Sequence, residues 1–371
     1  FKRIYCKMNK EKFDEYYIRE TFKLALNGKF TAHPNPMVGA VVVKNNKIIG
    51  KGFHLKPGSP HAEQVAIKNA GISALNSTLY INLEPCCHYG RTPPCSDLII
   101  NKKIKRVVIS SLDPNPLVNG KSVKQLRSAG IEVKIGILKD EAIKLNNGFF
   151  KKFVLKRPII ICKSGISLDG KISLNNGVSK WITSIDSRKD VQMERAVSSL
   201  IFSSSKTVIM DNPNFNVRNP ELLKKIIKQP CLGIVDRALK IPLENKIFKN
   251  ISRKIYLFTS VKNTAKKYKK NVTIVYIKAE KGKMNIAKCM SYLATQDINS
   301  VFIEAGPTLI ESFLKKSLID EMILYIAPKI IGHTGKSFSG VTYIKELSKK
   351  INYRISDMIA IGNNLKVRLE K

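Results

Sequence analysis

A histidine, a glutamate and two cysteines have the types and spacing of a catalytic zinc site. His61 and Glu63 are two positions apart, and Cys86 and Cys95 are separated by eight residues. One imidazole and two thiolates fill three tetrahedral positions on Zn²⁺ and leave the fourth for water. The metal lowers the pKa of that water, which allows hydrolysis near neutral pH. Glu63 suits a proton shuttle, which takes a proton from water and returns it to the leaving group.

Two helix starts are expected to position these side chains. Pro60 suits the first turn of a helix, which places the His-x-Glu pair at a helix N-terminus. Pro93 and Pro94 before Cys95 indicate the start of a second helix. The positive end of the helix dipole favours a thiolate at that position because it lowers the thiol pKa.

Three other interpretations of these residues stay open. The cysteines could be ordinary buried thiols and His61 a core histidine, although His-x-Glu and Pro-Cys would then coincide by accident. A structural zinc site would need Cys87 or His88 as a fourth ligand and would give Glu63 no role. A deaminase that edits nucleic acid would need single-stranded substrate and aromatic stacking platforms.

The net charge of +37, from 65 Lys and Arg against 28 Asp and Glu, raises the question of nucleic-acid binding. The lysines are scattered through every segment, and clusters such as 266–270 have the composition of exposed faces. No recognition motif accompanies them. We therefore expect a small-molecule substrate and no nucleic-acid partner, although a phosphate-bearing substrate or cofactor would be attracted by this charge.

The length of 371 residues, with 43% hydrophobic residues, predicts two globular domains. Seven unevenly spaced cysteines argue against a disulfide framework and favour a reducing cytoplasm. The basic N-terminal run lacks the apolar core of a signal peptide, and no run approaches a membrane span. We expect a cytoplasmic protein with no membrane partner.

Alternating helical and strand patterns predict an α/β fold in both halves. The basic segment 150–158 is a plausible junction, which gives domains 1–150 and 151–371. In the first half, helical patterns cover 12–27, 61–69, 120–129 and 140–147, and strand patterns cover 38–43, 47–52, 78–83, 106–110 and 131–136. In the second half, strands are predicted at 159–163, 207–210, 231–236, 254–258, 272–276 and 300–304, and helices at 186–199, 284–295 and 308–315.

Two features of the second half suggest a nucleotide-cofactor site, although the Rossmann glycine fingerprint is absent. The apolar strand 301–304 runs into a Gly306-Pro307 turn and a helix, where backbone N–H groups and the helix dipole suit a diphosphate. Arg195 and Arg218 flank the segment 207–211, and arginines suit planar contacts to phosphate. Each feature alone is weak.

The chain resembles the bifunctional deaminase/reductase family of riboflavin biosynthesis along most of its length. Matching runs in the first half read HPNPMVG at 33–39, HAE at 61–63 and LEPCCHYGRTPPC at 83–95, with Cys87 where a serine is expected. Matching runs in the second half read SLDG at 167–170, WIT at 181–183 and EAGPT at 304–308, and 320–329 also matches. The resemblance implies a cytidine-deaminase-like layered domain followed by a dihydrofolate-reductase-like domain that uses NADPH.

The resemblance also assigns roles to individual residues. It gives zinc to His61, Cys86 and Cys95, and the pyrimidine to Asn35. The residues that it assigns to NADPH are Gly165, Trp181, Thr207, Asp211, Arg237, Gly306, Pro307 and Thr308. The residues that it assigns to the ribose-phosphate substrate are Ser179, Arg195, Phe215, Arg218 and Glu304.

The resemblance implies two consecutive reactions. The first is hydrolytic removal of the 2-amino group of a diaminopyrimidinone ribosyl phosphate. The second is reduction of the ribosyl group to ribityl by NADPH, which carries the hydride while the protein supplies orientation. We also expect a homo-oligomer.

Overall fold

The computed structural model describes residues 10–90, 93–178, 181–280, 282–340 and 351–371, which divide into two compact units, 1–155 and 156–371. Both units are α/β, as the alternating patterns predicted. Within the described residues, no helix is both long enough and apolar enough to cross a membrane.

The first unit is a layered α/β domain around a five-stranded sheet. Its strands are β1 (Gly39–Lys44), β2 (Lys47–Phe53), β3 (Thr78–Leu83), β4 (Arg106–Ser111) and β5 (Glu132–Ile135), in the order β2-β1-β3-β4-β5. β1 is antiparallel to β2 and β3, whereas β3, β4 and β5 are parallel. Its helices are α1 (Lys10–Ala25), α2 (Ala62–Ala70), α3 (Cys95–Asn101), α4 (Lys121–Ser128), α5 (Lys139–Leu145) and α6 (Asn147–Leu155), with 3₁₀ turns at Leu26–Gly28 and Gly71–Ala74.

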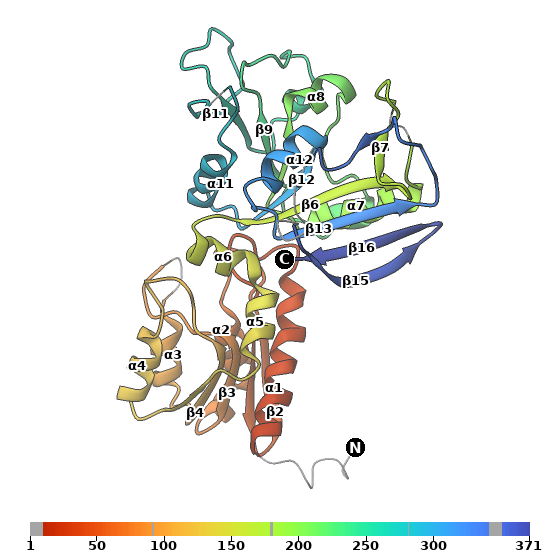
Figure 1. Ribbon diagram of the computed structural model, residues 1–371. Helices are drawn as coiled ribbons and strands as arrows, with labels where there is room; N and C mark the ends of the chain where they lie inside the picture. The colour runs from red at the N-terminus through yellow and green to blue at the C-terminus, as the bar shows by residue number, and fades with distance from the viewer. Residues whose placement is uncertain (1–9, 91–92, 179–180, 281, 341–350) are drawn as a thin grey trace. The chain divides into compact units, whose positions relative to one another are not determined.

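Alternate residues of the strands face two different helical layers. Val41 and Val43 pack against Ile18 of α1, whereas Ala40 and Val42 pack against α2. Figure 1 shows α3 and α4 on one side of β3 and β4, with α1 and α5 on the other. Successive side chains of a strand point to opposite faces of the sheet. Alternate residues of β1 therefore contribute to the core under α1 and to the core under α2.

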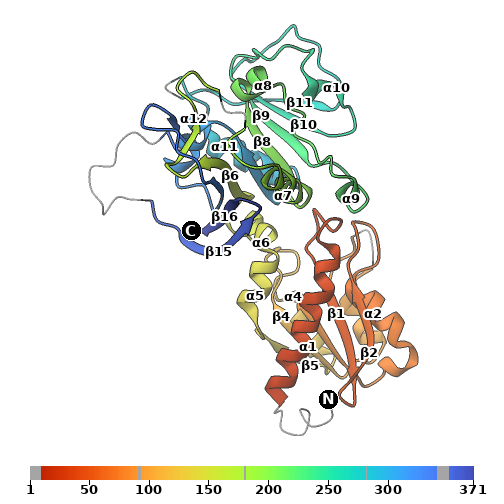
Figure 2. The same ribbon diagram turned by 90° about the vertical axis from the view of Figure 1, so that its right-hand side faces the viewer.

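The second unit is built on a nine-stranded sheet in the order β11-β10-β9-β8-β12-β6-β13-β16-β15. All strands from β11 through β6 to β13 in this order run parallel to their neighbours. β16 is antiparallel to β13, and β15 is antiparallel to β16. The strands are β6 (Ile159–Ser167), β8 (Leu200–Ser204), β9 (Cys231–Val235), β10 (Ile255–Thr259), β11 (Val272–Tyr276), β12 (Ser300–Glu304), β13 (Glu321–Ala327), β15 (Arg354–Ile361) and β16 (Asn364–Glu370). Figure 2 shows β8, β9 and β10 side by side.

Helices cover both faces of this sheet. The helices are α7 (Ile185–Ala196), α8 (Ser205–Asp211), α9 (Pro220–Leu223), α10 (Lys246–Lys249), α11 (Ile286–Thr295) and α12 (Pro307–Leu314). α7, α8 and α10 pack on the face that carries Ile201 and Phe302, and α11 and α12 pack on the opposite face. A separate pair of short strands, β7 (Lys171–Ser173) and β14 (Lys336–Ser337), completes the described elements of this unit.

One sequence prediction about local structure is wrong. The segment 207–210 was predicted as a strand but lies in helix α8, and the strand is β8 immediately before it. Val208 is buried there while Ile209 and Met210 are exposed, so tertiary packing overrides the β-propensity of these side chains. The segment 150–158, predicted as a domain junction, contains the end of helix α6 at Leu155 and the boundary between the two compact units.

Candidate functional sites

Helix α2 carries His61 and Glu63 at its start. His61 is the N-cap residue rather than a residue within the first turn, and its backbone N–H donates to the Gln64 side chain over 2.9 Å. α2 lies directly against β2 because β2 contains Gly50 and Gly52. A Cβ atom on Gly52 would lie 2.3 Å from the carbonyl oxygen of Ala62. Glycine therefore sets how close the helix that bears His61 comes to the sheet.

The two cysteines come from the loop after β3 and from the first residue of α3. The Cys95 N–H lies 3.4 Å from the Cys86 sulfur, and the Ser96 N–H donates to the Cys86 carbonyl over 3.1 Å. Glu84 holds the same loop, since its carboxylate accepts bonds from the Gly120 N–H and the Ser122 hydroxyl. The start of α3 thus contacts Cys86 as well as supplying Cys95.

These side chains form a group with the chemistry of a zinc site. The Nδ1 atom of His61 lies 3.4 Å from the sulfurs of both Cys86 and Cys95, and the three ligand atoms are all within 4.8 Å of one another. Hydrogen bonding from Cys95, together with His61, lowers the pKa of the Cys86 thiol to about 4 although burial opposes ionisation. One nitrogen and two sulfurs at this separation fit Zn²⁺ with a position left open.

Glu63 lies next to this group. It is 3% exposed, and burial raises the pKa of its carboxyl to about 7. The charge of His61 acts in the opposite direction. Cys87 and His88, the rival ligands, are not members of the group among the residues that the structure describes. The Cys87 sulfur instead lies 3.7 Å from the Leu117 carbonyl.

Asn35 reaches the zinc-site residues through His54, which sequence reasoning missed. The amide nitrogen of Asn35 is 3.0 Å from Nε2 of His54, and Nδ1 of His54 is 3.3 Å from the Pro60 carbonyl. The His54 and His61 rings meet edge to face with centroids 5.4 Å apart. Burial lowers the pKa of His54 and favours the neutral ring, whose Nδ1–H then donates to Pro60.

Two buried asparagines hold the loop 33–39 that carries Asn35. Asn82 of β3 accepts from the Gly39 N–H and donates to the Met37 carbonyl, over 2.8 and 2.9 Å. Asn146, between α5 and α6, accepts from the Met37 N–H over 2.8 Å and donates to the Met37 carbonyl over 2.9 Å. Neither asparagine belongs to a recognisable motif, so the sequence offered no signal for this role.

In the second unit, most residues assigned to NADPH and substrate lie at the carboxyl ends of parallel strands. Glu304 ends β12, Gly165 is near the end of β6, and Arg237 follows β9. Thr207 is in α8, directly after β8, with its hydroxyl 3.3 Å from that of Ser204, and Asp211 is the exposed last residue of α8. Gly306 is the N-cap of α12 with Pro307 at its first position and Thr308 next. Ligands of open α/β sheets bind at this edge.

Arg195 and Glu304 form a buried ion pair. Nε and Nη2 of Arg195 donate to the two carboxylate oxygens over 2.5 and 2.9 Å, and Nη1 donates to the Asn216 carbonyl over 2.9 Å. Lys163, which sequence reasoning missed, is 3.6 Å from the same carboxylate. Burial opposes ionisation of Glu304, but Arg195 and Lys163 outweigh it and lower the pKa to about 2.

Cations gather beside this pair. Burial and the charge of Arg195 lower the pKa of Arg218, and Arg188 contributes in the same direction. The Arg188 guanidinium stacks 3.9 Å from the centroid of the Trp181 ring, which is 63% exposed. Such a cluster suits a phosphate group. Ser179, also assigned to the substrate, lies outside the described residues.

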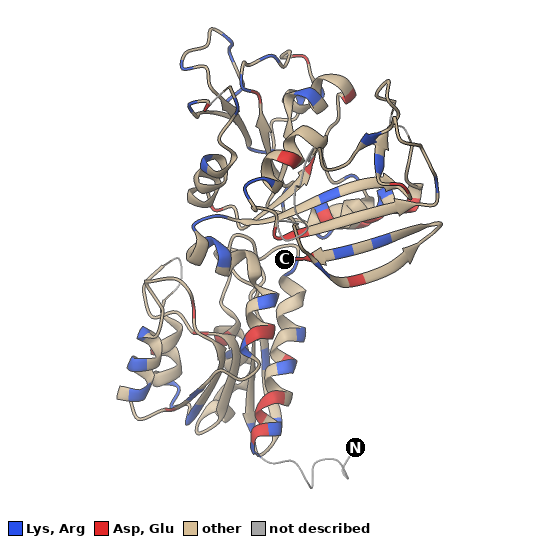
Figure 3. Ribbon diagram, viewed as in Figure 1, with Lys and Arg blue, Asp and Glu red and all other residues tan. Residues whose placement is uncertain are grey.

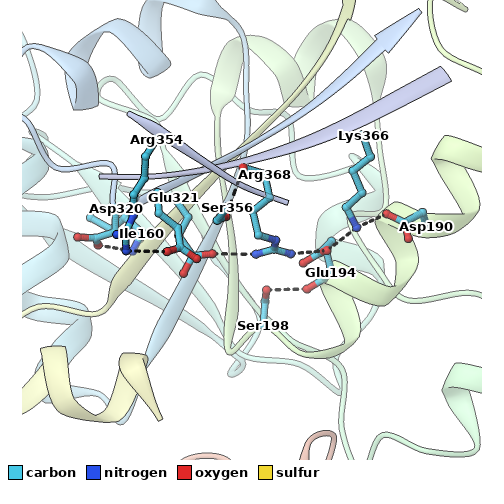
Figure 4. A network of polar contacts seen from close by, with 11 residues as sticks. Ile160, Asp190, Glu194, Ser198, Asp320, Glu321, Arg354, Ser356, Lys366 and Arg368 are labelled. Carbon is cyan, nitrogen blue, oxygen red and sulfur yellow. Dashed lines mark hydrogen bonds and ion pairs between the residues drawn. The ribbon is translucent and has the colours of Figure 1, made fainter. Parts of the chain in front are cut away.

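Helix α7 carries Arg195, and other charged side chains of the same helix bind charged side chains of β16. Figure 4 shows Asp190 and Glu194 of α7 facing Lys366 and Arg368. Lys366 Nζ lies 2.6 Å from Asp190 and 2.9 Å from Glu194, and Arg368 lies 2.7 Å from Glu194. α7 therefore presents Arg195 to the carboxyl edge while Glu194 fixes it to the hairpin.

Figure 3 shows Lys and Arg distributed over elements of both units rather than on one face of one element. The scatter of lysines along the sequence is thus a scatter over the fold as well.

The class of protein follows from two domain matches. The zinc-binding region of cytidine and deoxycytidylate deaminases matches residues 11–111, and the RibD C-terminal domain matches residues 158–367. The chain is 38% identical to riboflavin biosynthesis protein RibD of Escherichia coli, over 96% of this chain and 99% of that protein. It is 40% identical to RibD of Aquifex aeolicus, over 95% and 97%.

Solved structures agree with these matches. RibD of Acinetobacter baumannii is 37% identical with a TM-score of 0.88, covering 97% of this chain and 99% of that one. A Thermotoga maritima diaminohydroxyphosphoribosylaminopyrimidine deaminase/5-amino-6-(5-phosphoribosylamino)uracil reductase is 32% identical with a TM-score of 0.85, covering 98% and 99%.

This chain belongs to the RibD family of riboflavin biosynthesis proteins. It is a bifunctional hydrolase and oxidoreductase, with a zinc-dependent deaminase and an NADPH-dependent reductase, acting on small molecules.

Proposed function

We propose that the chain removes the 2-amino group of 2,5-diamino-6-ribosylamino-4(3H)-pyrimidinone 5′-phosphate and then reduces the ribosyl group of the product to ribityl. The observation that carries this proposal is the His61, Cys86 and Cys95 group with Glu63 beside it, in a chain whose other unit has a cation-lined carboxyl edge. The name of the Thermotoga maritima relative states both a deaminase and a reductase activity.

In the deaminase, His61, Cys86 and Cys95 would hold zinc, which supplies the Lewis acidity that makes water nucleophilic near neutral pH. Glu63 takes a proton from the attacking water and passes it to the departing amino group, so that ammonia leaves as the ring carbon becomes a carbonyl. Asn35 holds the pyrimidine, and His54 orients Asn35 through their 3.0 Å contact. Glu63 is thus the residue that moves protons at both stages.

In the reductase, NADPH supplies the hydride that is delivered to C1′ of the ribose. Gly165, Trp181, Thr207, Asp211 and Arg237 would bind this cofactor, together with the turn at Gly306, Pro307 and Thr308. Ser179, Arg195, Phe215, Arg218 and Glu304 would bind the ribose phosphate. The position of most of these residues at one edge of the sheet supports the assignment.

The direct test is to incubate the purified protein with the diaminopyrimidinone phosphate, with and without NADPH, and to measure product masses. Without NADPH we expect replacement of an amino group by oxygen. With NADPH we expect that product to gain two hydrogens. An unchanged substrate mass in both incubations contradicts the proposal.

Replacing Arg195 with Lys should weaken reduction although net charge is unchanged. A lysine ammonium cannot reproduce the planar fork to Glu304 together with the bond to the Asn216 carbonyl. We expect the reductase KM for the ribosyl substrate to rise about ten-fold, the cost of one lost charge-assisted hydrogen bond. Steady-state kinetics at low and moderate salt measure this, since non-specific attraction by surface lysines would be screened by salt. A KM equal to wild type at both salt concentrations removes Arg195 from the site.

We further propose that residues 1–150 form the deaminase domain and 151–371 the reductase domain. The compact units 1–155 and 156–371 support a division in this region. The chain is also proposed to be cytoplasmic, on the basis of its cysteine usage.

A homo-oligomer is proposed from the edge strand β15. Ile355, Met358 and Ile359 are 65%, 58% and 44% exposed on this strand, and a sheet edge pairs readily with a second copy of itself. Light scattering coupled to size-exclusion chromatography tests this proposal. A mass of one chain at micromolar concentration contradicts it.

A further inference from the structure

The loop between α8 and α9 has a backbone that needs external support. It carries Arg218 and Phe215, two of the five residues proposed to bind the ribose phosphate, and the Phe215 side chain is only 4% exposed. Asn212 and Phe215 have φ angles of 42° and 47°, in the left-handed region that side chains other than glycine rarely adopt. Such conformations persist where surrounding contacts over-determine them.

Side chains from other elements supply those contacts. Arg253, just before β10, donates from Nη1 to the Phe215 carbonyl over 2.6 Å and from Nη2 to the Asn214 carbonyl over 2.5 Å. Gln229, before β9, bonds both to the Val217 N–H, over 2.8 Å, and to the Val217 carbonyl, over 2.9 Å.

Two residues of α7 hold the same loop from its other side. Gln192 accepts from the Arg218 N–H over 2.8 Å, and Arg195 donates to the Asn216 carbonyl. Each residue from Asn214 to Arg218 thus has a backbone group bonded to a side chain from elsewhere in the fold.

Arg253 is the least expected member of this set. Its side chain is buried, with the residue only 4% exposed, and its guanidinium binds backbone carbonyls. Within the described part of the chain, no carboxylate forms an ion pair with it. Burial and the charge of Arg195 lower its pKa to about 10. A buried cation without a carboxylate partner opposes folding, so stability alone does not account for an arginine at this position.

We propose that Arg253 is a positioning residue of the reductase: its two bonds fix the 214–218 loop in the conformation that presents Arg218 to the substrate. This inference rests on the proposed reductase function. Arg253 itself does not touch the substrate. Gln229 fixes the other end of the loop and carries no charge, so it separates loop positioning from a purely electrostatic effect.

The test compares Arg253→Met, Arg253→Lys and Gln229→Met in the full-length protein, supplied with the deaminated ribosylaminouracil phosphate and NADPH. A loop that is no longer held should raise the KM for the ribosyl substrate by about 10- to 100-fold, the range that displaced binding groups cause. The KM for NADPH should stay unchanged. Arg253→Lys should give a smaller rise than Arg253→Met, because one ammonium can still bind one carbonyl.

Arg157→Lys is the matched control. Arg157 also makes two bonds to a buried partner, Asp320, over 2.6 and 2.9 Å, but at the amino end of β13. The Arg157→Lys substitution should lower the melting temperature without changing the KM for the ribosyl substrate or for NADPH. If Arg253→Met does not fold, Arg253→Lys and Gln229→Met carry the same comparison.

Three results overturn the inference. The first is a lower melting temperature with both KM values at wild type, and the second is an equal rise in the two KM values. The third is an effect of Arg253→Met that Gln229→Met fails to reproduce, since the charge alone would then be responsible. If the wild-type protein does not oxidise NADPH with this substrate, the proposed reductase function fails instead.

Discussion

Glu63→Gln should retain zinc and lose deaminase turnover by about 10²- to 10⁴-fold, the usual contribution of a general acid–base. The amide has nearly the shape of the carboxylate, so the buried position at the start of α2 should stay filled. It cannot accept a proton from water and pass it to the amino group. Ammonia release under saturating substrate measures the loss, and metal analysis of the same sample measures zinc.

The reductase supplies the control for this variant. Given the already deaminated intermediate, Glu63→Gln should oxidise NADPH at the wild-type rate, because residues 1–155 and 156–371 form separate compact units with separate cores. Near-normal deamination would refute the role of Glu63. Loss of both activities would instead mean that the two reactions share one site.

Cys86→Ser should abolish zinc binding and ammonia release, whereas Cys87→Ser should preserve both. The Cys86 sulfur lies 3.4 Å from His61 Nδ1, and the surroundings lower its pKa to about 4, so a thiolate ready for metal is lost. The Cys87 sulfur is directed to the Leu117 carbonyl, and burial raises its pKa. The two neighbouring cysteines thus form a matched pair of variants with the same chemical change.

Zinc content per chain, measured in both variants after dialysis against a chelator, shows which of the two cysteines is a zinc ligand. If Cys87→Ser loses zinc and Cys86→Ser keeps it, the ligand assignment is wrong. If both variants keep zinc and activity, neither cysteine is a ligand.

The sequence predicted the group around His61 because its members occur in short motifs whose residue types have few other uses. The prolines before Cys95 also placed it at a helix start, where the structure has it. His54, Asn82 and Asn146 could not be predicted, since each is a single polar residue whose partner is brought to it only by folding.

The fold class was predictable from alternating patterns, but two kinds of local structure were not. The run 207–210 contains β-branched residues and was predicted as a strand, yet the sheet uses β8 and leaves Ile209 exposed on α8. β16 was missed because its burial depends on partners such as Glu194 of α7, which neutralise Lys366 and Arg368 there. Charged residues in a strand are ordinarily a sign against burial.

The two asparagines that hold Met37 bear on how small an autonomous deaminase could be. The deaminase match ends at residue 111, so a fragment cut at that point would retain His61, Cys86 and Cys95. It would lack Asn146, whose side chain closes on the loop that carries Asn35. A fragment that ends at residue 111 would therefore keep the metal ligands but lose the Asn146 contacts that hold the loop 33–39. The segment from residue 112 through Asn146 thus belongs to the functional deaminase.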